Sequence, residues 1–364
     1  MTSAAIQTKR GHGTTLLELN AEGTTPVSGL EILDLQMWFS GVKIPVGGIS
    51  AVYCDENHRN LGYARACMQF ALELQRREGK MLSFLFGIPG FYERFGYTVV
   101  MPWYAVYVSV EVGRALPLEP QMKNADDLDK RSAVYLYDQL VAARIGPVAR
   151  ELANRIQPHK TVKWWTSGLM RVLHGTEGEF RGYVWHSDPG EEEFEVVEVG
   201  GVDHEAYELM LAYLVNEARR RGKQQIVAAL PPDDPFSLFL KRYGGKFVIT
   251  TRASGGGMAK ILQFRELCSA LSPVFQKRVQ SFKNDLIPSR LTLLTEASEG
   301  VVELQGTGHE TRLTANSAEM TKLLFGYWDF PEALRNGISS TLSLEVGRQL
   351  FIRAYPFMYL RDRF

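Results

Sequence analysis

A basic, glycine-containing turn stands directly before an expected helix: Arg59-Asn60-Leu61-Gly62-Tyr63-Ala64, with the pattern R-x-x-G-x-A. The first N–H groups of a helix have no partner within the helix, and the positive end of its dipole attracts an anion such as a pyrophosphate. Gly62 allows a close approach of the backbone, and Arg59 adds a mobile positive charge. A helix that begins with Arg and Gly is also a common structural feature, so this pattern alone does not establish a binding site.

An aromatic segment follows at about the distance that one β-α-β unit spans, with the sequence Phe91-Tyr92-Glu93-Arg94-Phe95-Gly96-Tyr97. A phenol can donate a proton to a departing group when it is placed close to that group. The other interpretation is that Tyr92, one of 15 tyrosines, only packs in an aromatic cluster with its neighbours. The residue type by itself leaves both interpretations open.

The elements that must position these residues form one predicted β-α-β unit over residues 46–86. The segment VGGISAVYC is typical of a strand, and MLSFLF is typical of a short buried strand. Between them, residues 62–78 carry apolar side chains at helical spacing, and Gly79 ends this helix. Residues 16–19, 30–38 and 105–112 are further predicted strands. The basic turn and the aromatic segment therefore follow the ends of two successive strands.

Together, the two motifs resemble those of the GNAT superfamily of acetyl-coenzyme A-dependent N-acetyltransferases. In that superfamily R-x-x-G-x-G/A binds a pyrophosphate, and a Y-x-R-x-G-F/Y element follows the next strand. The whole arrangement resembles more closely the enhanced-intracellular-survival (Eis-like) acetyltransferases, and the resemblance covers nearly the full chain. It implies an α/β and α+β fold: tandem GNAT folds with mixed central sheets and flanking helices, followed by a small sterol-carrier-protein-like α+β domain.

The resemblance also implies roles for individual residues. The acetyl-coenzyme A groove would be formed by Ala51, Val52, Tyr53, Arg59, Asn60, Leu61, Gly62, Tyr63, Ala64, Gly87 and Ile88. Tyr92 matches the general acid that protonates the departing sulfur, and the terminal carboxylate of Phe364 matches the general base. Last residues of a chain are usually frayed. The apolar run over residues 355–360 argues against a frayed end, because exposing it to water would be costly.

Three domains are expected, over residues 1–119, 120–256 and 257–364. In the second, predicted helices at 126–144 and 148–155 precede a strand, helix, strand order that ends in FLKRYGGKF, which repeats the order ending in FYERFGY and predicts an internal duplication. This copy lacks the basic turn, so we expect it to bind no coenzyme A. The third begins with the segment MAKILQFRELCSAL, which is typical of a helix, and continues with three short strands and two helices.

Composition excludes several classes of protein. Lys and Arg total 41, as do Asp and Glu, so no net positive charge attracts the chain to nucleic acid or to a membrane surface. No apolar run is long enough to span a membrane, and the start has no secretory signal, so a cytoplasmic protein is expected. The three cysteines and seven histidines lack metal-ligand spacing, so we expect buried free thiols and no metal.

The resemblance has two departures. A complete GNAT fold would place a strand and two helices before residues 16–19, so either the chain is a shortened form with an open acceptor site or its start is misassigned. Asn60 and Leu61 stand where relatives are commonly richer in Arg, which would weaken the electrostatic part of cofactor binding.

The expected function is transfer of an acetyl group from acetyl-coenzyme A to a primary amine by direct attack. The acceptor is either an aminoglycoside-like or polyamine-like small molecule or a protein lysine. The alternatives are a catalytically silent scaffold and, with less support, a lipid carrier. Members of the resembled family form hexamers, so the resemblance also implies a homo-oligomer.

Overall fold

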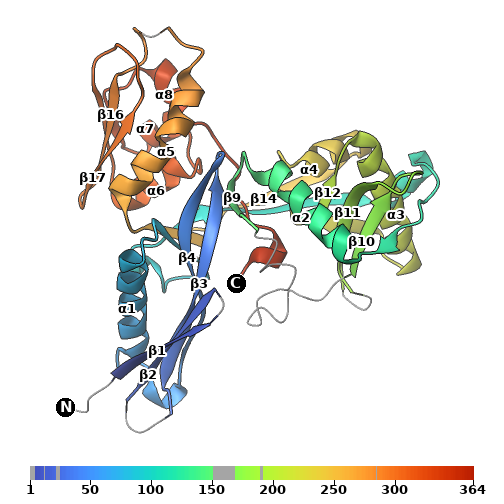
Figure 1. Ribbon diagram of the computed structural model, residues 1–364, viewed down its shortest axis with the longest axis horizontal. Helices are drawn as coiled ribbons and strands as arrows, with labels where there is room; N and C mark the ends of the chain where they lie inside the picture. Colours follow the sequence, from blue (N-terminus) through green and yellow to red (C-terminus); the bar gives the residue numbers. More distant parts are fainter. Residues whose placement is uncertain (1–4, 12, 22–24, 151–168, 189–191, 284) are drawn as a thin grey trace. The chain divides into compact units, whose positions relative to one another are not determined.

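The computed structural model describes residues 5–11, 13–21, 25–150, 169–188, 192–283 and 285–364 (Figure 1). The chain divides into two units. The first contains Met1–Met101, Arg252–Pro356 and Phe364, and the second contains Pro102–Thr251 and Phe357–Arg363. Each unit is built around its own mixed sheet.

The main sheet of the first unit contains one parallel pair among antiparallel neighbours. Its spatial order is β1 (Ala5–Gly11), β2 (Thr14–Asn20), β3 (Ser28–Phe39), β4 (Val42–Cys54), β5 (Leu82–Gly87), β15 (Gly256–Ile261) and β6 (Thr98–Met101). Strands β4 and β5 are parallel, and helix α1 (Tyr63–Arg77) connects them and runs alongside the sheet (Figure 1). This is the β-α-β unit that the sequence predicts.

Helix α1 packs on one face of this sheet because its apolar side chains recur at helical spacing. Cys67, Met68 and Ala71 are fully buried against Leu30 and Ile49 of the strands. Residues alternate between the two faces of a strand, so this core fixes which side chains of β3 and β4 point away from the helix. The face opposite α1 is named the open face below.

The first unit also contains a small α+β part, as the sequence predicts. Helix α5 (Phe264–Val279) leads into a sheet with the order β17 (Glu299–Glu303), β16 (Arg290–Leu294), β18 (Thr311–Thr314) and β19 (Ser339–Ser340). Three short helices accompany it, α6 (Ser317–Leu324), α7 (Phe330–Arg335) and α8 (Leu344–Leu350). Its likeness to a sterol-carrier protein stays a prediction.

The sheet of the second unit has the order β14 (Lys246–Thr250), β7 (Trp103–Ser109), β13 (Gln225–Ala228), β12 (Phe194–Gly201), β11 (Phe180–His186), β10 (Leu169–His174) and β8 (Lys123–Asn124). Its helices are α2 (Asp127–Val141), α3 (His204–Arg220) and α4 (Pro235–Leu240), and β9 (Ile145–Val148) follows α2. The pair β12 and β13 is parallel and is joined by α3, as β4 and β5 are joined by α1. This shared order adds an argument for the predicted duplication.

Two elements differ from the sequence prediction. The segment expected as one helix from Met258 begins as strand β15, and helix α5 starts only at Phe264. Met258 and Ala259, on opposite faces of the strand, are both fully buried, since Met258 lies in the core that α1 covers and α6 also contacts β15. A strand that is buried on both faces has a continuous apolar run in its sequence. Periodicity alone cannot distinguish such a run from a segment of a buried helix.

The predicted helix over 148–155 is also wrong in its described residues: Val148 ends strand β9, and Ala149 and Arg150 lie in no helix or strand. Residues 151–155 lie outside the described residues. Strand β7, which corresponds to the predicted strand at 105–112, pairs with β13 and β14 of the second unit. The three domain ranges 1–119, 120–256 and 257–364 stay predictions.

The segment Phe357–Arg363, named the tail, is held within the second unit by a buried charge network. Arg150 donates to both carboxylate oxygens of Glu198, at 2.6 and 2.5 Å, and also to Asp362. The guanidinium of Arg361 lies 3.6 Å from the ring centroid of Trp185, and Leu360 is buried beside it. The tail is therefore fixed by several interactions rather than frayed.

Asp234 gives this unit a testable dependence on pH. Its carboxylate caps α4 by accepting from the N–H of Phe236, and the hydroxyl of Tyr359 donates to it at 3.4 Å. Burial raises the pKa of Asp234 from 3.8 to about 6. Between about pH 4 and pH 6 the folded state therefore binds more protons than the unfolded state, and stability falls as the pH rises.

The variant Asp234→Asn keeps the cap but does not titrate. Its free energy of unfolding is expected to rise relative to wild type by about 3 kcal/mol between pH 4 and pH 7. Urea denaturation of both proteins at several pH values measures this difference. A difference in unfolding free energy between the two proteins that does not change with pH would contradict the raised pKa of Asp234.

Candidate functional site

Strands β4 and β5 stop pairing part way along their length. Their parallel register runs from Val46 and Leu82 to Ile49 and Leu85, and no pair follows in the described part of these strands. Strand β5 continues beside β15, with Gly87 opposite Gly256. The two strand ends therefore diverge, and beyond this point the backbone groups of β4 and β5 do not pair with each other. This feature is named the strand parting.

A β-bulge in β4 marks the start of the strand parting. Glu31 of β3 faces Ser50, and Gly29 faces Tyr53, so one residue of β3 opposes Ala51 and Val52 together. Ala51 has a φ of 50°, which is unusual for a residue other than glycine. A bulge leaves an extra residue unpaired in the ladder, so backbone groups at Ala51 and Val52 are free to meet a ligand.

The basic turn leads directly from β4 to an uncapped helix start. A short 3-10 helix over Glu56–His58 precedes Arg59, and Gly62 with a φ of 87° forms the N-cap of α1. No side chain caps this end, and its first turn contains no acidic residue. Arg59 is largely exposed and pairs with the exposed Glu56 at 3.3 Å. The backbone N–H groups at this helix start are thus suited to an anion, and the anion site itself stays a prediction.

The other predicted groove residues lie at the two edges of the strand parting. Gly87 is the last residue of β5 and Ile88 follows it, and Tyr53 lies near the end of β4, beyond the bulge. Tyr53, Leu61 and Ile88 are large apolar residues that are 41%, 62% and 63% exposed. Exposed apolar side chains that follow two neighbouring strands are suited to contact the non-polar parts of a long ligand.

Tyr92 lies on the α1 face of the strand parting. It is 8% exposed, its ring meets that of Phe91 edge-on at 4.9 Å, and it belongs to the core that α1 covers. A Cβ atom added to Gly87 would lie 2.6 Å from the Tyr92 ring, so Gly87 makes room for it. Burial raises the pKa of Tyr92, which keeps its phenol protonated. Tyr92 thus packs in an aromatic cluster, and its role as a proton donor stays a prediction.

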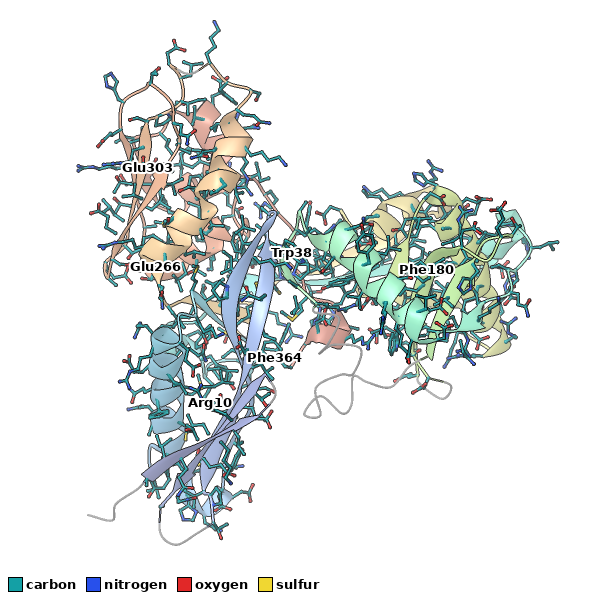
Figure 2. The ribbon with its side chains drawn as sticks, viewed as in Figure 1. Arg10, Trp38, Phe180, Glu266, Glu303 and Phe364 are labelled. Atoms are coloured by element: carbon teal, nitrogen blue, oxygen red, sulfur yellow. The ribbon has the colours of Figure 1, made fainter. Side chains whose placement is uncertain are left out.

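Phe364 lies on the open face of the same strands. Its ring meets those of Phe84 and Phe86 nearly edge-on, at 6.3 and 6.1 Å, and lies over Gly48 (Figure 2). Neighbouring residues of β5 point to opposite faces, and Leu85 lies in the α1 core with Tyr92. Tyr92 and Phe364 therefore flank the strand parting from its two faces.

Sequence reasoning missed Gly48 and the bulge at Ala51. A Cβ atom on Gly48 would lie 2.6 Å from the Phe364 ring, so only glycine leaves space for that ring. The sequence did contain a signal for Gly48, because two successive glycines inside a strand often mark a close approach of another group. The bulge has no comparable signal in the sequence.

Among the described residues, no group of three or more His, Cys, Asp or Glu side chains is arranged to hold a metal. Cys67 and Cys268 are buried free thiols, as predicted, and Cys54 is half-buried. No described helix has the length and apolar character needed to cross a membrane.

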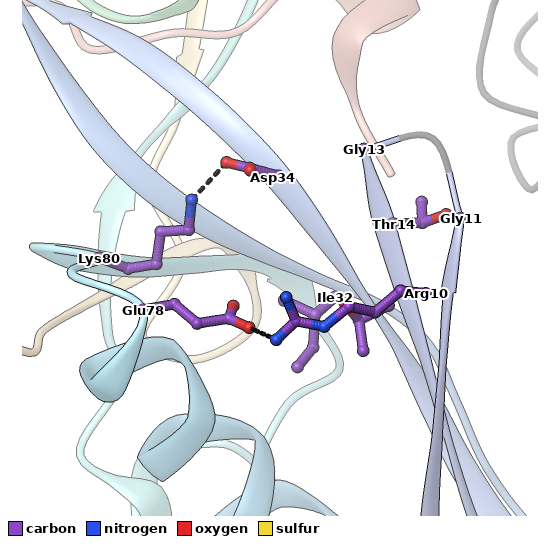
Figure 3. A pocket seen from close by; sticks show the side chains of 9 residues that line it. Arg10, Gly11, Gly13, Thr14, Ile32, Asp34, Glu78 and Lys80 are labelled. Carbon is purple, nitrogen blue, oxygen red and sulfur yellow. Dashed lines mark hydrogen bonds and ion pairs between the residues drawn. The ribbon is translucent and has the colours of Figure 1, made fainter.

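A separate pocket of about 360 Å³ lies near the end of α1, lined by Arg10, Asp34, Glu78, Lys80 and residues of β2 and β3 (Figure 3). Arg10 pairs with Glu78, and Lys80 pairs with Asp34. Each cation already has an acidic partner, so this pocket offers no free charge to a ligand. The strand parting is therefore the stronger candidate site.

The contact between Gly48 and Phe364 predicts a non-additive pair of substitutions. Gly48→Ala is expected to destabilise the protein by about 1–3 kcal/mol, because the new methyl group overlaps the ring. In a Phe364→Ala background the same change is expected to cost almost nothing. Unfolding free energies of the two single variants and the double variant measure this coupling, and strictly additive costs would refute the contact.

Comparison with known proteins agrees with this geometry. Residues 19–100 match the family model of the acetyltransferase (GNAT) domain. No curated protein matches the chain.

Solved structures share the fold at low sequence identity. A GCN5-related N-acetyltransferase from Kribbella flavida is 18% identical, with 96% of this chain and 88% of that chain covered and a TM-score of 0.65. A conserved protein of unknown function from Enterococcus faecalis V583, described as a probable N-acyltransferase, is 17% identical, with 97% and 89% covered and a TM-score of 0.73. Eis1 from Mycobacterium abscessus is 16% identical, with 96% and 90% covered and a TM-score of 0.63. Residues 19–100 therefore match a GNAT acetyltransferase domain, and the chain shares its fold with solved structures of N-acetyltransferases.

Proposed function

We propose that the protein is an N-acetyltransferase that transfers an acetyl group from acetyl-coenzyme A to a primary amine. The observation that carries this proposal is the strand parting, with its bulge at Ala51 and the uncapped start of α1 that follows the same strand. All of these features fall within the matched residues 19–100. The acceptor is a small amine or a protein lysine.

In this proposal the groove holds acetyl-coenzyme A mainly through the backbone. The pyrophosphate lies over residues 59–64, where the free N–H groups of α1 and the Arg59 guanidinium attract it. Ala51, Val52 and Tyr53 pair with the amides of the pantetheine arm, as an added strand would. Gly87 and Ile88 form the opposite edge.

The proposed reaction is direct attack of the neutral amine on the thioester carbonyl. The nitrogen forms a bond to the acetyl carbon, the bond from that carbon to sulfur breaks, and N–H groups near Val52 stabilise the negative oxygen in between. The Phe364 carboxylate accepts the proton that the nitrogen loses, directly or through a water. Tyr92 donates its proton to the departing sulfur. Holding both reactants in line supplies much of the rate.

The remaining expectations extend this proposal. By resemblance, the second domain binds no coenzyme A and the third is sterol-carrier-like. The protein acts in the cytoplasm as a homo-oligomer, requires no metal, and does not bind nucleic acid or membranes.

Calorimetric titration with acetyl-coenzyme A tests the groove. Saturable micromolar binding is expected for wild type, and Arg59→Glu is expected to weaken it at least about tenfold, because the change replaces an attractive charge beside the pyrophosphate with a repulsive one. Arg77→Glu is the matched control, since Arg77 lies on the last turn of the same helix and pairs with Glu73. Wild-type protein that binds no acetyl-coenzyme A would leave only a catalytically silent fold.

Substitution of Tyr92 tests the chemistry separately from binding. Tyr92→Phe keeps the ring packing and is expected to lower kcat by about 100-fold or more, because general acid catalysis contributes at least that much. The dissociation constant of acetyl-coenzyme A is expected to stay within about threefold of wild type. Steady-state rates and titrations of the same preparation give both values, and an unchanged kcat would remove Tyr92 from the mechanism.

A further inference from the structure

The loop that carries Tyr92 is held by a segment from a distant part of the chain. This loop, residues 90–97, follows β5 and is named the Tyr92 loop. The turn over residues 252–256 leads into β15, the strand that pairs with β5. Gly90 of the loop and Ser254 of the turn are hydrogen-bonded although 164 residues separate them in the sequence. The position of Tyr92 therefore depends on contacts that its own neighbours in the sequence do not supply.

The side chain of Ser254 bridges the two sides of Tyr92. The N–H of Gly90 donates to the Ser254 hydroxyl at 2.7 Å, and this hydroxyl donates to a carboxylate oxygen of Glu93. Gly90 lies two residues before Tyr92, and Glu93 directly follows it. Because a hydroxyl can accept one hydrogen bond while it donates another, a single side chain ties both ends of this short stretch together. A hydrogen bond to a charged carboxylate is also stronger than one between neutral groups.

The turn that carries Ser254 is shaped for a close approach to the Tyr92 loop. Gly255 and Gly256 have φ values of 77° and 75°, which favour glycine. A Cβ atom added to Gly255 would lie 3.0 Å from the carbonyl oxygen of Gly87 and 3.0 Å from the nitrogen of Pro89. The turn thus lies directly against the backbone that leads into the loop, so the Ser254 contact is part of a packed interface within the first unit.

A second contact from the same segment fastens the other end of the loop. Lys260, on β15, donates from its ammonium to the carbonyl oxygen of Phe95 at 2.5 Å. Phe95 in turn donates its N–H to the carbonyl oxygen of Tyr92 at 3.0 Å. A Cβ atom on Gly96 would lie 2.9 Å from the Lys260 nitrogen, so glycine at this position leaves space for the ammonium. The Tyr92 loop is therefore tied to residues 254–260 both before and after Tyr92.

A proton donor needs this degree of constraint more than a packed ring does. The Tyr92 ring lies against Phe91 and Tyr97, at 4.9 and 6.2 Å between centroids, and such contacts tolerate small shifts of the ring. Proton transfer instead requires the phenol to lie within hydrogen-bonding distance of the departing atom. A misplacement of about 1 Å can lower a rate by about 100-fold. Bonds that fix the backbone on both sides of Tyr92 limit shifts of this size.

We propose that Ser254 and Lys260 are positioning residues that hold the Tyr92 loop, so that the phenol meets the departing sulfur. The inference rests on the proposed function for the role of Tyr92. Neither residue takes part in the proposed bond changes, and both act through the backbone that carries Tyr92. The segment that enters the first unit at residue 252 thus contributes to the chemistry as well as to the sheet.

Substitution of Ser254 tests the bridge and leaves the glycines of the turn in place. In Ser254→Ala, kcat is expected to fall about tenfold, because the phenol is less precisely placed. The dissociation constant of acetyl-coenzyme A is expected to stay within about threefold of wild type. Ser272→Ala is the matched control, since the Ser272 hydroxyl also donates to one group, the Cys268 carbonyl, and accepts from another, the Glu303 N–H. It is expected to keep the wild-type kcat.

A double-mutant cycle with Tyr92→Phe shows whether the loss acts through the phenol. Ser254→Ala is expected to cause no further loss of kcat in the Tyr92→Phe background. Lys260→Met keeps a long unbranched side chain without the N–H donor, and it is expected to show the same dependence on Tyr92. Equal losses of kcat with and without the phenol would overturn the positioning role.

Amide hydrogen exchange measured by mass spectrometry supplies a readout that needs no turnover. Exchange over residues 90–97 is expected to be at least about fivefold faster in Ser254→Ala than in wild type, and unchanged in Ser272→Ala. If wild type acetylates no amine, the proposed function fails, and faster exchange in Ser254→Ala still supports the hold on the loop. Unchanged exchange over these residues, or a wild-type kcat in both Ser254→Ala and Lys260→Met, would overturn the inference.

Discussion

The end of pairing between β4 and β5 is the constraint on which the rest of the site depends. A parallel pair that continued past Ile49 and Leu85 would satisfy its own backbone and leave nothing for a ligand. Each strand is held on its far side, β4 by β3 and β5 by β15, so the two ends cannot close onto each other. The bulge at Ala51 turns the backbone of β4 at the same point. A ligand that pairs like a strand is the simplest way to satisfy groups exposed in this manner.

The strand parting also explains how the proposed chemistry can divide between the two faces of one sheet. A ligand between the strand ends is accessible from both sides, so groups with opposite tasks need not contact each other. Tyr92, which stays protonated because it is buried, lies on the α1 face. The ring of Phe364 lies on the open face. The residues proposed as acid and base thus lie on opposite faces of the same sheet.

Patterns in the sequence predicted those parts of the site that lie within one short stretch of the chain. The β-α-β unit, the basic turn before α1 and the segment with Tyr92 each lie within a short stretch, where periodicity and helix-start signals apply. The insertion of β15 between β5 and β6 was not predicted, because the pairing joins segments far apart in the sequence and both its faces are buried. The bulge at Ala51 depends on strand register, which the sequence of one strand does not specify. The position of Phe364 was implied by resemblance, and only the structure shows Gly48 beneath its ring.

The network around Arg150 is better understood as a device for specificity than as a source of stability. Removing Arg150 and Glu198 from water is expensive, and their attraction repays that cost only with good geometry, which the two-pronged contact provides. Apolar side chains of similar volume would stabilise the unit at least as well. They would not, however, distinguish one register of the tail from the next, whereas Asp362 meets Arg150 in one register only. A costly charge network of this kind is suited to fix the register of the tail within the second unit.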